Sequence, residues 1–141
     1  MTSEREPADP GLRAAAAWLQ FAADDLNMAE LGAGSQVAAG WAIGFHCQQA
    51  VEKAMKGGLA LHGIAPPATH VFKTLCELLI QAGCEPPLDP RRLGLLQPLA
   101  TRERYPALSL LPISREEAAE LLPDARQTVA WLRRMLEQAS R

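Results

Sequence analysis

The chain is poor in the features that mark several large classes of protein. Aromatic residues make up 5% of its 141 residues, so aliphatic and alanine side chains must supply most of the core. The formal net charge is −2, too small by itself to indicate attraction to a nucleic acid or a membrane surface. No apolar run approaches ~20 residues, so we expect no membrane-spanning segment. The polar, acidic N-terminal sequence has no apolar signal core, and we expect a cytoplasmic protein.

Cysteine and glycine patterns that carry chemistry are also lacking. The three cysteines, Cys47, Cys76 and Cys84, are an odd number without metal-type spacing, which indicates buried thiols in a reducing compartment. The glycines of Gly32–Ser35 follow a helical pattern rather than a strand, so they do not form a phosphate loop. We therefore expect neither a metal site nor a cofactor.

What the sequence does contain is helical periodicity. Residues 1–10 hold two prolines and four charged side chains, and we expect a disordered tail followed by one domain over residues 11–141. Apolar residues recur at helical spacing over residues 12–31. Trp18, Phe21 and Met28 widen that apolar arc, which predicts burial against two neighbours.

Three further segments have helical signals of their own. A second long helix is predicted over residues 37–61, with fraying or close packing at Gly57 and Gly58 because glycine disfavours a helix interior. Thr69 is a suitable N-cap for a helix that starts at His70 and ends at Gln81. Asp89 followed by Pro90 opens a short helix that reaches about residue 97.

The last helix begins with a capping box. Ser114 stands at the cap and Glu117 three residues later, and Pro123 should kink the helix because proline removes a backbone donor. Residues 101–113 have no clear period and are expected to form an ordered connector. The predicted fold is all-α, a four-to-five-helix up-and-down bundle with two long antiparallel helices first and a kinked last helix.

The second long helix carries many hydrogen-bonding groups. Its third stripe, after two largely apolar ones, is polar: His46, Gln49, Lys53 and Lys56. All three lysines of the protein fall within residues 41–75, and residues 91–104 carry four arginines against one glutamate. Two such basic segments could meet in space and bind an anion such as a phosphate. The alternative interpretation is a solvated face, which is what charge clusters usually are.

Several motifs resemble those of the HEPN domain family, in the same order. They are "FHCQQAVEKAMK" (Phe45–Lys56), "HG" (His62–Gly63), "PPATH" ending at His70, and "RYP" (Arg104–Pro106). The resemblance covers roughly residues 12–138. It implies a helical bundle that usually forms a homodimer. For the prokaryotic type it also implies a minimal nucleotidyltransferase as partner, in pairs that resemble toxin–antitoxin modules.

The ribonuclease motif of some members of that family is absent. Those members carry an arginine, four to six intervening residues and a histidine near the start of the last helix. The histidines here are His46, His62 and His70, and none follows an arginine at that spacing. No catalytic residue can therefore be assigned from the resemblance.

Two sets of site residues are predicted. The ligand-binding set, for a nucleotide or RNA phosphate, comprises His46, Gln49, Lys53, Lys56, His70 and Arg104. The structural set comprises Gln48, Glu52 and Tyr105; Gln48 and Glu52 need partners if buried, and Arg104 is a candidate partner for Glu52.

Two alternative functions remain open. One is a divergent metal-independent ribonuclease, in which Arg104 stabilises the phosphate while His70 or His46 acts as acid or base. The other is a purely structural dimer with the polar stripe at its interface.

Overall fold

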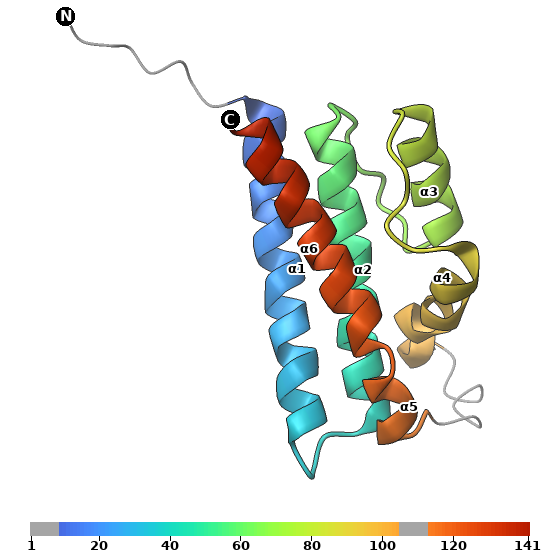
Figure 1. Cartoon of the computed structure of the whole chain (residues 1–141). Coiled ribbons are helices and arrows are strands. Elements are labelled where there is room, and N and C mark those ends of the chain that lie inside the picture. Colours follow the sequence, from blue (N-terminus) through green and yellow to red (C-terminus); the bar gives the residue numbers. More distant parts are fainter. Residues whose placement is uncertain (1–8, 105–112) are drawn as a thin grey trace, which may run out of the picture.

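The computed structural model describes residues 9–104 and 113–141, and every regular element in these ranges is helical. Figure 1 shows a bundle built on a long hairpin, with smaller helices on one side of it. The elements are α1 (Pro10–Gly34), α2 (Gly40–Leu61), α3 (Phe72–Gln81), α4 (Pro90–Leu96), the 3₁₀ helix η1 (Gln97–Arg104), α5 (Arg115–Ala119) and α6 (Leu122–Ala139). The predicted all-α bundle is confirmed.

The first two helices are long and antiparallel, as predicted (Figure 1). α1 begins two residues before its predicted start, because the Asp9 side chain accepts a hydrogen bond from the Gly11 backbone N–H at 2.9 Å and Pro10 occupies the first turn. Residues 9 and 10, predicted as part of a tail, therefore belong to the helix and its cap, while residues 1–8 lie outside the described part of the chain. No helix in the described ranges is both long and apolar enough to cross a membrane.

α2 is the central element of the bundle. It contacts α1, α3, α5, α6 and η1, and most of its second half is buried. Gly57 and Gly58 allow this, because a β-carbon on either would overlap the side chain of Leu132 or the ring of Trp131. Fraying or close packing was predicted at these glycines, and the structure shows close packing.

α1 packs on both α2 and α6, so the predicted burial against two neighbours is confirmed. Its contacts rely on Ala15, Ala22 and Ala29, spaced by seven residues and fully buried. Phe21 and Met28 are 55% and 51% exposed, so the prediction that they join a wide buried arc is wrong. Leu19 and Leu26 are partly buried against the same core, whereas Phe21 and Met28 lie outside the contact.

α3 runs in the same direction as α2, because the connection over residues 62–71 returns along the bundle before the helix starts (Figure 1). The predicted start at His70 with Thr69 as N-cap is wrong, since α3 begins at Phe72. The Phe72 N–H instead donates to Oε1 of Gln97 at 2.8 Å, and Thr69 Oγ1 accepts from the Val71 N–H at 3.2 Å.

The last helical region is bent, as predicted. Ser114 and Glu117 form the full capping box of α5, and the chain then breaks before α6, which has Pro123 in its first turn. The short helix α4 ends at Leu96 and continues as η1 to Arg104, so the first four residues of the predicted ordered connector over residues 101–113 are helical. The rest of that connector, residues 105–112, lies outside the described residues.

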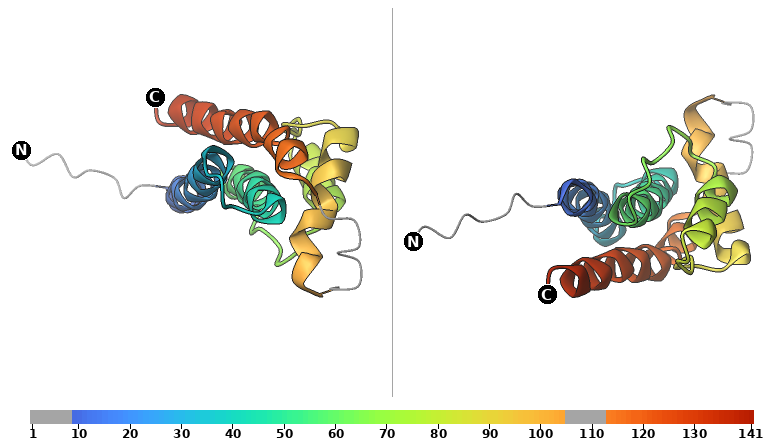
Figure 2. Two further views of the ribbon diagram at one scale, coloured as in Figure 1. Left: turned by 90° about the horizontal axis from the view of Figure 1, so that it is seen from below. Right: turned by 90° about the horizontal axis from the view of Figure 1, so that it is seen from above.

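Figure 2 shows how these elements surround α2. α6 covers one side of the α1–α2 hairpin, and the connection over residues 62–71 and η1 lie on the other side (Figure 2). The two sides of α2 therefore meet different neighbours, and the polar stripe lies toward the second set.

Candidate functional site

The first half of the site is built around the carboxylate of Asp25, which lies on α1 and binds two side chains of α2. Asp25 is 8% exposed, and its two oxygens bind different partners. Oδ1 lies 2.8 Å from Nδ1 of His46 and Oδ2 lies 2.5 Å from Nζ of Lys53. His46 and Lys53 are seven residues apart, two turns of α2, so they reach the same point on α1.

The second half repeats this arrangement around Glu52, which is 3% exposed. Its Oε1 lies 2.8 Å from Nδ1 of His70, and its Oε2 accepts from Nζ of Lys56 at 3.3 Å. Each carboxylate thus lies between one imidazole and one ammonium group. A buried carboxylate needs such partners, because an unpaired charge in the interior is strongly destabilising.

Two glutamines extend the Glu52 cluster toward the polar stripe. Nε2 of Gln48, a fully buried residue, donates to Oε1 of Glu52 at 3.1 Å. Nε2 of Gln49 donates to Oε1 of Gln48 at 2.6 Å. The Lys56 ammonium also lies over the Trp18 ring, 5.7 Å from its centroid. Hydrogen bonds therefore connect Gln49 to Glu52 and on to His70.

The carboxylates fix how the imidazoles are presented. An ionised carboxylate only accepts hydrogen bonds, so Nδ1 of His46 and of His70 must carry a proton. Nε2 is then left on the far edge of each ring, available to accept a proton or, once protonated, to donate. The side chains of His46 and His70 are 28% and 46% exposed, so both rings reach solvent.

His70 is held by its backbone as well as by its ring. The carboxamide of Gln97, at the start of η1, donates from Nε2 to the His70 carbonyl oxygen at 2.8 Å and accepts from the Phe72 N–H at 2.8 Å. This one side chain joins η1 to the start of α3. It orients the residue that carries the exposed imidazole.

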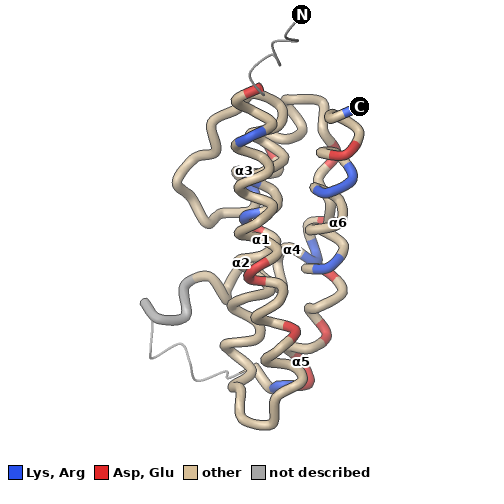
Figure 3. Tube along the Cα trace, turned by 90° about the vertical axis from the view of Figure 1, so that its left-hand side faces the viewer, with Lys and Arg blue, Asp and Glu red and all other residues tan. Residues whose placement is uncertain are grey.

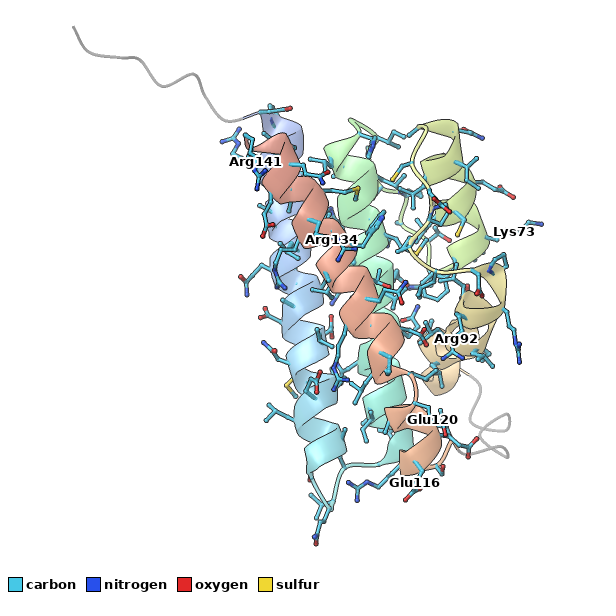
Figure 4. The ribbon with its side chains drawn as sticks, viewed as in Figure 1. Lys73, Arg92, Glu116, Glu120, Arg134 and Arg141 are labelled. Carbon is cyan, nitrogen blue, oxygen red and sulfur yellow. The ribbon has the colours of Figure 1, made fainter. Side chains whose placement is uncertain are left out.

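The other ion pairs of the described residues lie away from this stripe. Arg92 reaches from α4 to Asp124 near the start of α6, with Nη2 2.5 Å from Oδ2 (Figure 4). Arg126 binds Glu30 through two hydrogen bonds of 2.5 and 2.7 Å, and that guanidinium lowers the pKa of Glu30. Charged residues of both signs follow α6 (Figure 3). These pairs join helices of the bundle to one another.

The thiols offer no reactive centre. Cys47, Cys76 and Cys84 are free, and Cys47 and Cys84 are buried. Burial raises the pKa of Cys47 to about 12, with a smaller contribution from the charge of Asp124. No group of three His, Cys, Asp or Glu residues that could hold a metal ion occurs within residues 9–104 and 113–141.

Most of the predicted site residues lie in one region. His46, Gln49, Lys53 and Lys56 follow α2, and His70 joins them through Glu52. Arg104 closes η1, on the same side of α2 as the connection over residues 62–71 (Figure 2), but its side chain lies outside the described part of the structure. Tyr105 lies outside it altogether. Among the described side chains the partners of Glu52 are Gln48, Lys56 and His70, and the predicted pairing of Glu52 with Arg104 falls on a side chain outside them.

Sequence reasoning missed two residues that organise the site. Asp25 stands between Ala22 and Ala29 on the contact face of α1, and an acid at such a position signals a buried partner across the helix pair. Gln97 had no such signal, because its partners are backbone atoms of another element.

A comparison with protein families gives a match over most of the chain. The model of the HEPN domain matches residues 15–135, which include α2, α3 and every residue of the two carboxylate clusters. No curated protein and no solved structure shows a significant match. The match includes Asp25, His46, Glu52 and His70, so the site described above is part of the matched domain. The chain belongs to the HEPN domain family.

Proposed function

We propose that this HEPN domain is a binding module that holds a phosphate of a nucleotide or an RNA on the polar side of α2. The residues assigned to this site are the predicted set, His46, Gln49, Lys53, Lys56, His70 and Arg104, in which the buried Lys56 acts through Glu52 rather than on the ligand. The observation that carries the proposal is the pair of carboxylate-anchored imidazoles, His46 on Asp25 and His70 on Glu52, each with its outer edge toward solvent. Family membership agrees with it, because HEPN domains are nucleotide- and RNA-related modules in general.

The arrangement suits a phosphate for a physical reason. Rings held by buried carboxylates lose little side-chain freedom when a ligand binds, so their hydrogen bonds are preorganised. The Gln49 amide, the Lys53 ammonium and, once they are protonated, the outer ring nitrogens are donors of the kind that phosphate oxygens accept. The side chain of Lys53 is 28% exposed, whereas the side chain of Asp25 beneath it is 11% exposed. The hydrogen-bond donors of the site thus lie nearer to solvent than the carboxylates that hold them.

The test is binding of mononucleotides and short RNA to the double variant Lys53→Ala with Arg104→Ala. We expect a loss of affinity of at least tenfold, because two positive charges near the ligand are removed. A matched control is Lys73→Ala with Arg134→Ala, which removes the same charge from α3 and α6 (Figure 4). Equal affinity of the two double variants would contradict the proposal.

A ribonuclease is the second candidate, and one observation favours it. A carboxylate that orients an imidazole through Nδ1 leaves Nε2 free as acid or base, and the chain has two such pairs. The measurement is RNA cleavage by the purified protein in the presence of a chelator, with His70→Ala beside it. Cleavage by the parent protein that His70→Ala abolishes would favour the enzyme, and equal background in both would exclude it.

The homodimer, the nucleotidyltransferase partner and the toxin–antitoxin role stay predictions from the family, in which dimers are common. For the dimer, α1 offers a self-complementary face. Phe21 and Met28 are exposed and spaced by seven residues, and Arg13 and Asp24 are exposed on that face three turns apart. In an antiparallel pair of α1 helices, Arg13 of each copy lies opposite Asp24 of the other.

The test of this face is the oligomeric state, measured by light scattering. We expect Arg13→Glu to shift a dimer toward monomer, and the charge swap Arg13→Glu with Asp24→Arg to restore it. Ile80→Ala, an exposed apolar residue on α3, is the control and should leave the mass unchanged. A monomeric parent protein would contradict the proposed interface.

A further inference from the structure

We infer that His46 and His70, rather than the lysines, carry the positive charge that this site adds when a phosphate binds, so that the ligand is taken up together with protons. This inference rests on the proposed function and adds which groups of the site supply the positive charge. Its starting point is that each lysine already neutralises a carboxylate: Lys53 pairs with Asp25 at 2.5 Å and Lys56 with Glu52 at 3.3 Å.

The charge of the cluster follows directly. With both imidazoles neutral, two carboxylates and two ammonium groups cancel. An anion that approaches this cluster therefore meets no net charge until an imidazole gains a proton. The Arg104 guanidinium, which is always charged, would add an attraction that does not change with pH.

Lys56 is a positioning residue and does not contact the ligand. It is 7% exposed, and its ammonium group is occupied by Glu52 and by the face of the Trp18 ring. Lys53 is more exposed, yet its ammonium group could turn to a ligand only by leaving Asp25 with one partner fewer. Both lysines pair with the carboxylates, and the carboxylates in turn hold the imidazoles.

Each imidazole has a carboxylate at Nδ1 and an outer Nε2 atom without a hydrogen-bond partner among the described residues, which is the position where a second proton adds. His46 faces Asp25 of α1 and Lys53 of α2, and its ring also meets Phe45 edge to face at 5.4 Å. His70 faces Glu52, Lys56 and Gln48 of α2, and Gln97 of η1 holds its backbone. A proton taken from solvent at Nε2 turns each ring into a cation whose new N–H points outward. No other bond forms or breaks.

The proton uptake can be counted by calorimetry. The probe is tetrauridylate with hydroxyl groups at both ends, whose phosphodiesters and bases keep their charge between pH 5.5 and 8. Binding is measured at pH 7.5 in two buffers with different heats of ionisation. The same pair of measurements is made at pH 5.5. We expect an uptake of about one to two protons per ligand bound at pH 7.5 and little at pH 5.5. The affinity should be at least about tenfold higher at pH 5.5 than at pH 7.5.

The third histidine of the chain supplies a matched control. The Nδ1 atom of His62 lies 2.8 Å from the Gly58 carbonyl oxygen, and its ring has no carboxylate partner. His62→Gln should leave the proton uptake unchanged, whereas the double variant His46→Gln with His70→Gln should abolish it. Binding without proton uptake, or the same uptake in the double variant, would overturn the inference while leaving the phosphate site in place.

A second measurement needs no ligand. Nitrogen chemical shifts of the histidine rings in the free protein should report the Nδ1–H form for His46 and His70 at pH 8, and protonation of Nε2 as the pH falls to 5. The Nε2–H form at pH 8, or rings that do not titrate in this range, would overturn the inference. Failure of every nucleotide and RNA to bind would instead contradict the proposed function, whatever the shifts report.

Discussion

The two sides of α2 are stabilised by different kinds of interaction. On the side of α6, Leu132 and Trp131 fill the space that Gly57 and Gly58 leave, and the contact depends on shape. On the other side, carboxylates, imidazoles and lysines pair atom by atom. The first side can tolerate another apolar residue of similar volume. The second side depends on particular atoms, because a buried charge without its partner is costly. One helix thus carries the core on one side and the chemistry on the other.

The largest effect is expected from breaking the buried pair on the polar side. Lys56 is 7% exposed, and Glu52→Gln leaves its ammonium group buried without a carboxylate, so we expect a loss of about 4 kcal/mol in the free energy of unfolding. Denaturant unfolding at pH 8 measures it. The double variant Glu52→Gln with Lys56→Met should recover much of the loss, since it removes the unpaired charge. A loss below about 1 kcal/mol in the single variant would show that the pair is not buried in solution.

The next largest effect tests the apolar side. Leu132 is fully buried against Gly57, and Leu132→Ala should cost about 3 kcal/mol because it removes apolar contacts and leaves a cavity beside a residue that cannot fill it. Thermal and denaturant unfolding measure the change. Ile80→Ala, at a residue 62% exposed, should stay within about 0.5 kcal/mol of the parent. Phosphate affinity should be unchanged in Leu132→Ala under conditions in which it stays folded, and a selective loss would contradict the division between the two sides.

The third effect, smaller than the two above, is expected from removing the charge of Asp25. Asp25→Asn keeps the shape of the side chain and removes the charge that His46 and Lys53 share. Both partners are 28% exposed and can turn to water, so we expect a cost of only about 1–2 kcal/mol. A cost as large as that of Glu52→Gln would mean that both clusters are equally buried in solution.

The smallest effect belongs to an exposed ion pair away from the polar stripe. Arg126 lowers the pKa of Glu30, so the pair adds stability above the unfolded-state pKa, near 4.5, and loses it as the pH falls through the folded-state value. The side chains are 53% and 38% exposed, and Glu30→Gln should therefore cost less than about 1 kcal/mol at pH 7. The difference between parent and variant should vanish in acid. A difference that grows on acidification would contradict the assignment.

Local signals in the sequence predicted local structure well. The capping box of Ser114 and Glu117 and the cap at Asp89 depend on residues within three positions, and both form as expected. The all-α bundle and its long first hairpin followed from helical periodicity. The start of α3 could not be predicted this way, because its first N–H is bound by Gln97, 25 residues away.

The candidate site was predictable only in part, for the same reason. The polar stripe of α2 could be predicted from the sequence because its members repeat at helical spacing. Its organisation depends on Asp25, which is 21 residues from His46 and 28 from Lys53, and on the returning connection that brings His70 to Glu52. Helical periodicity says which residues share a face, but not which atom of another helix each will meet.

The most direct test of the phosphate site is a titration of the protein with tetrauridylate at pH 6, followed through the ring nitrogens of its three histidines. The account predicts that the Nε2 signals of His46 and His70 shift together and saturate with one dissociation constant, while those of His62 stay in place. Unchanged signals from His46 and His70 up to millimolar ligand, or equal shifts in all three rings, would contradict it.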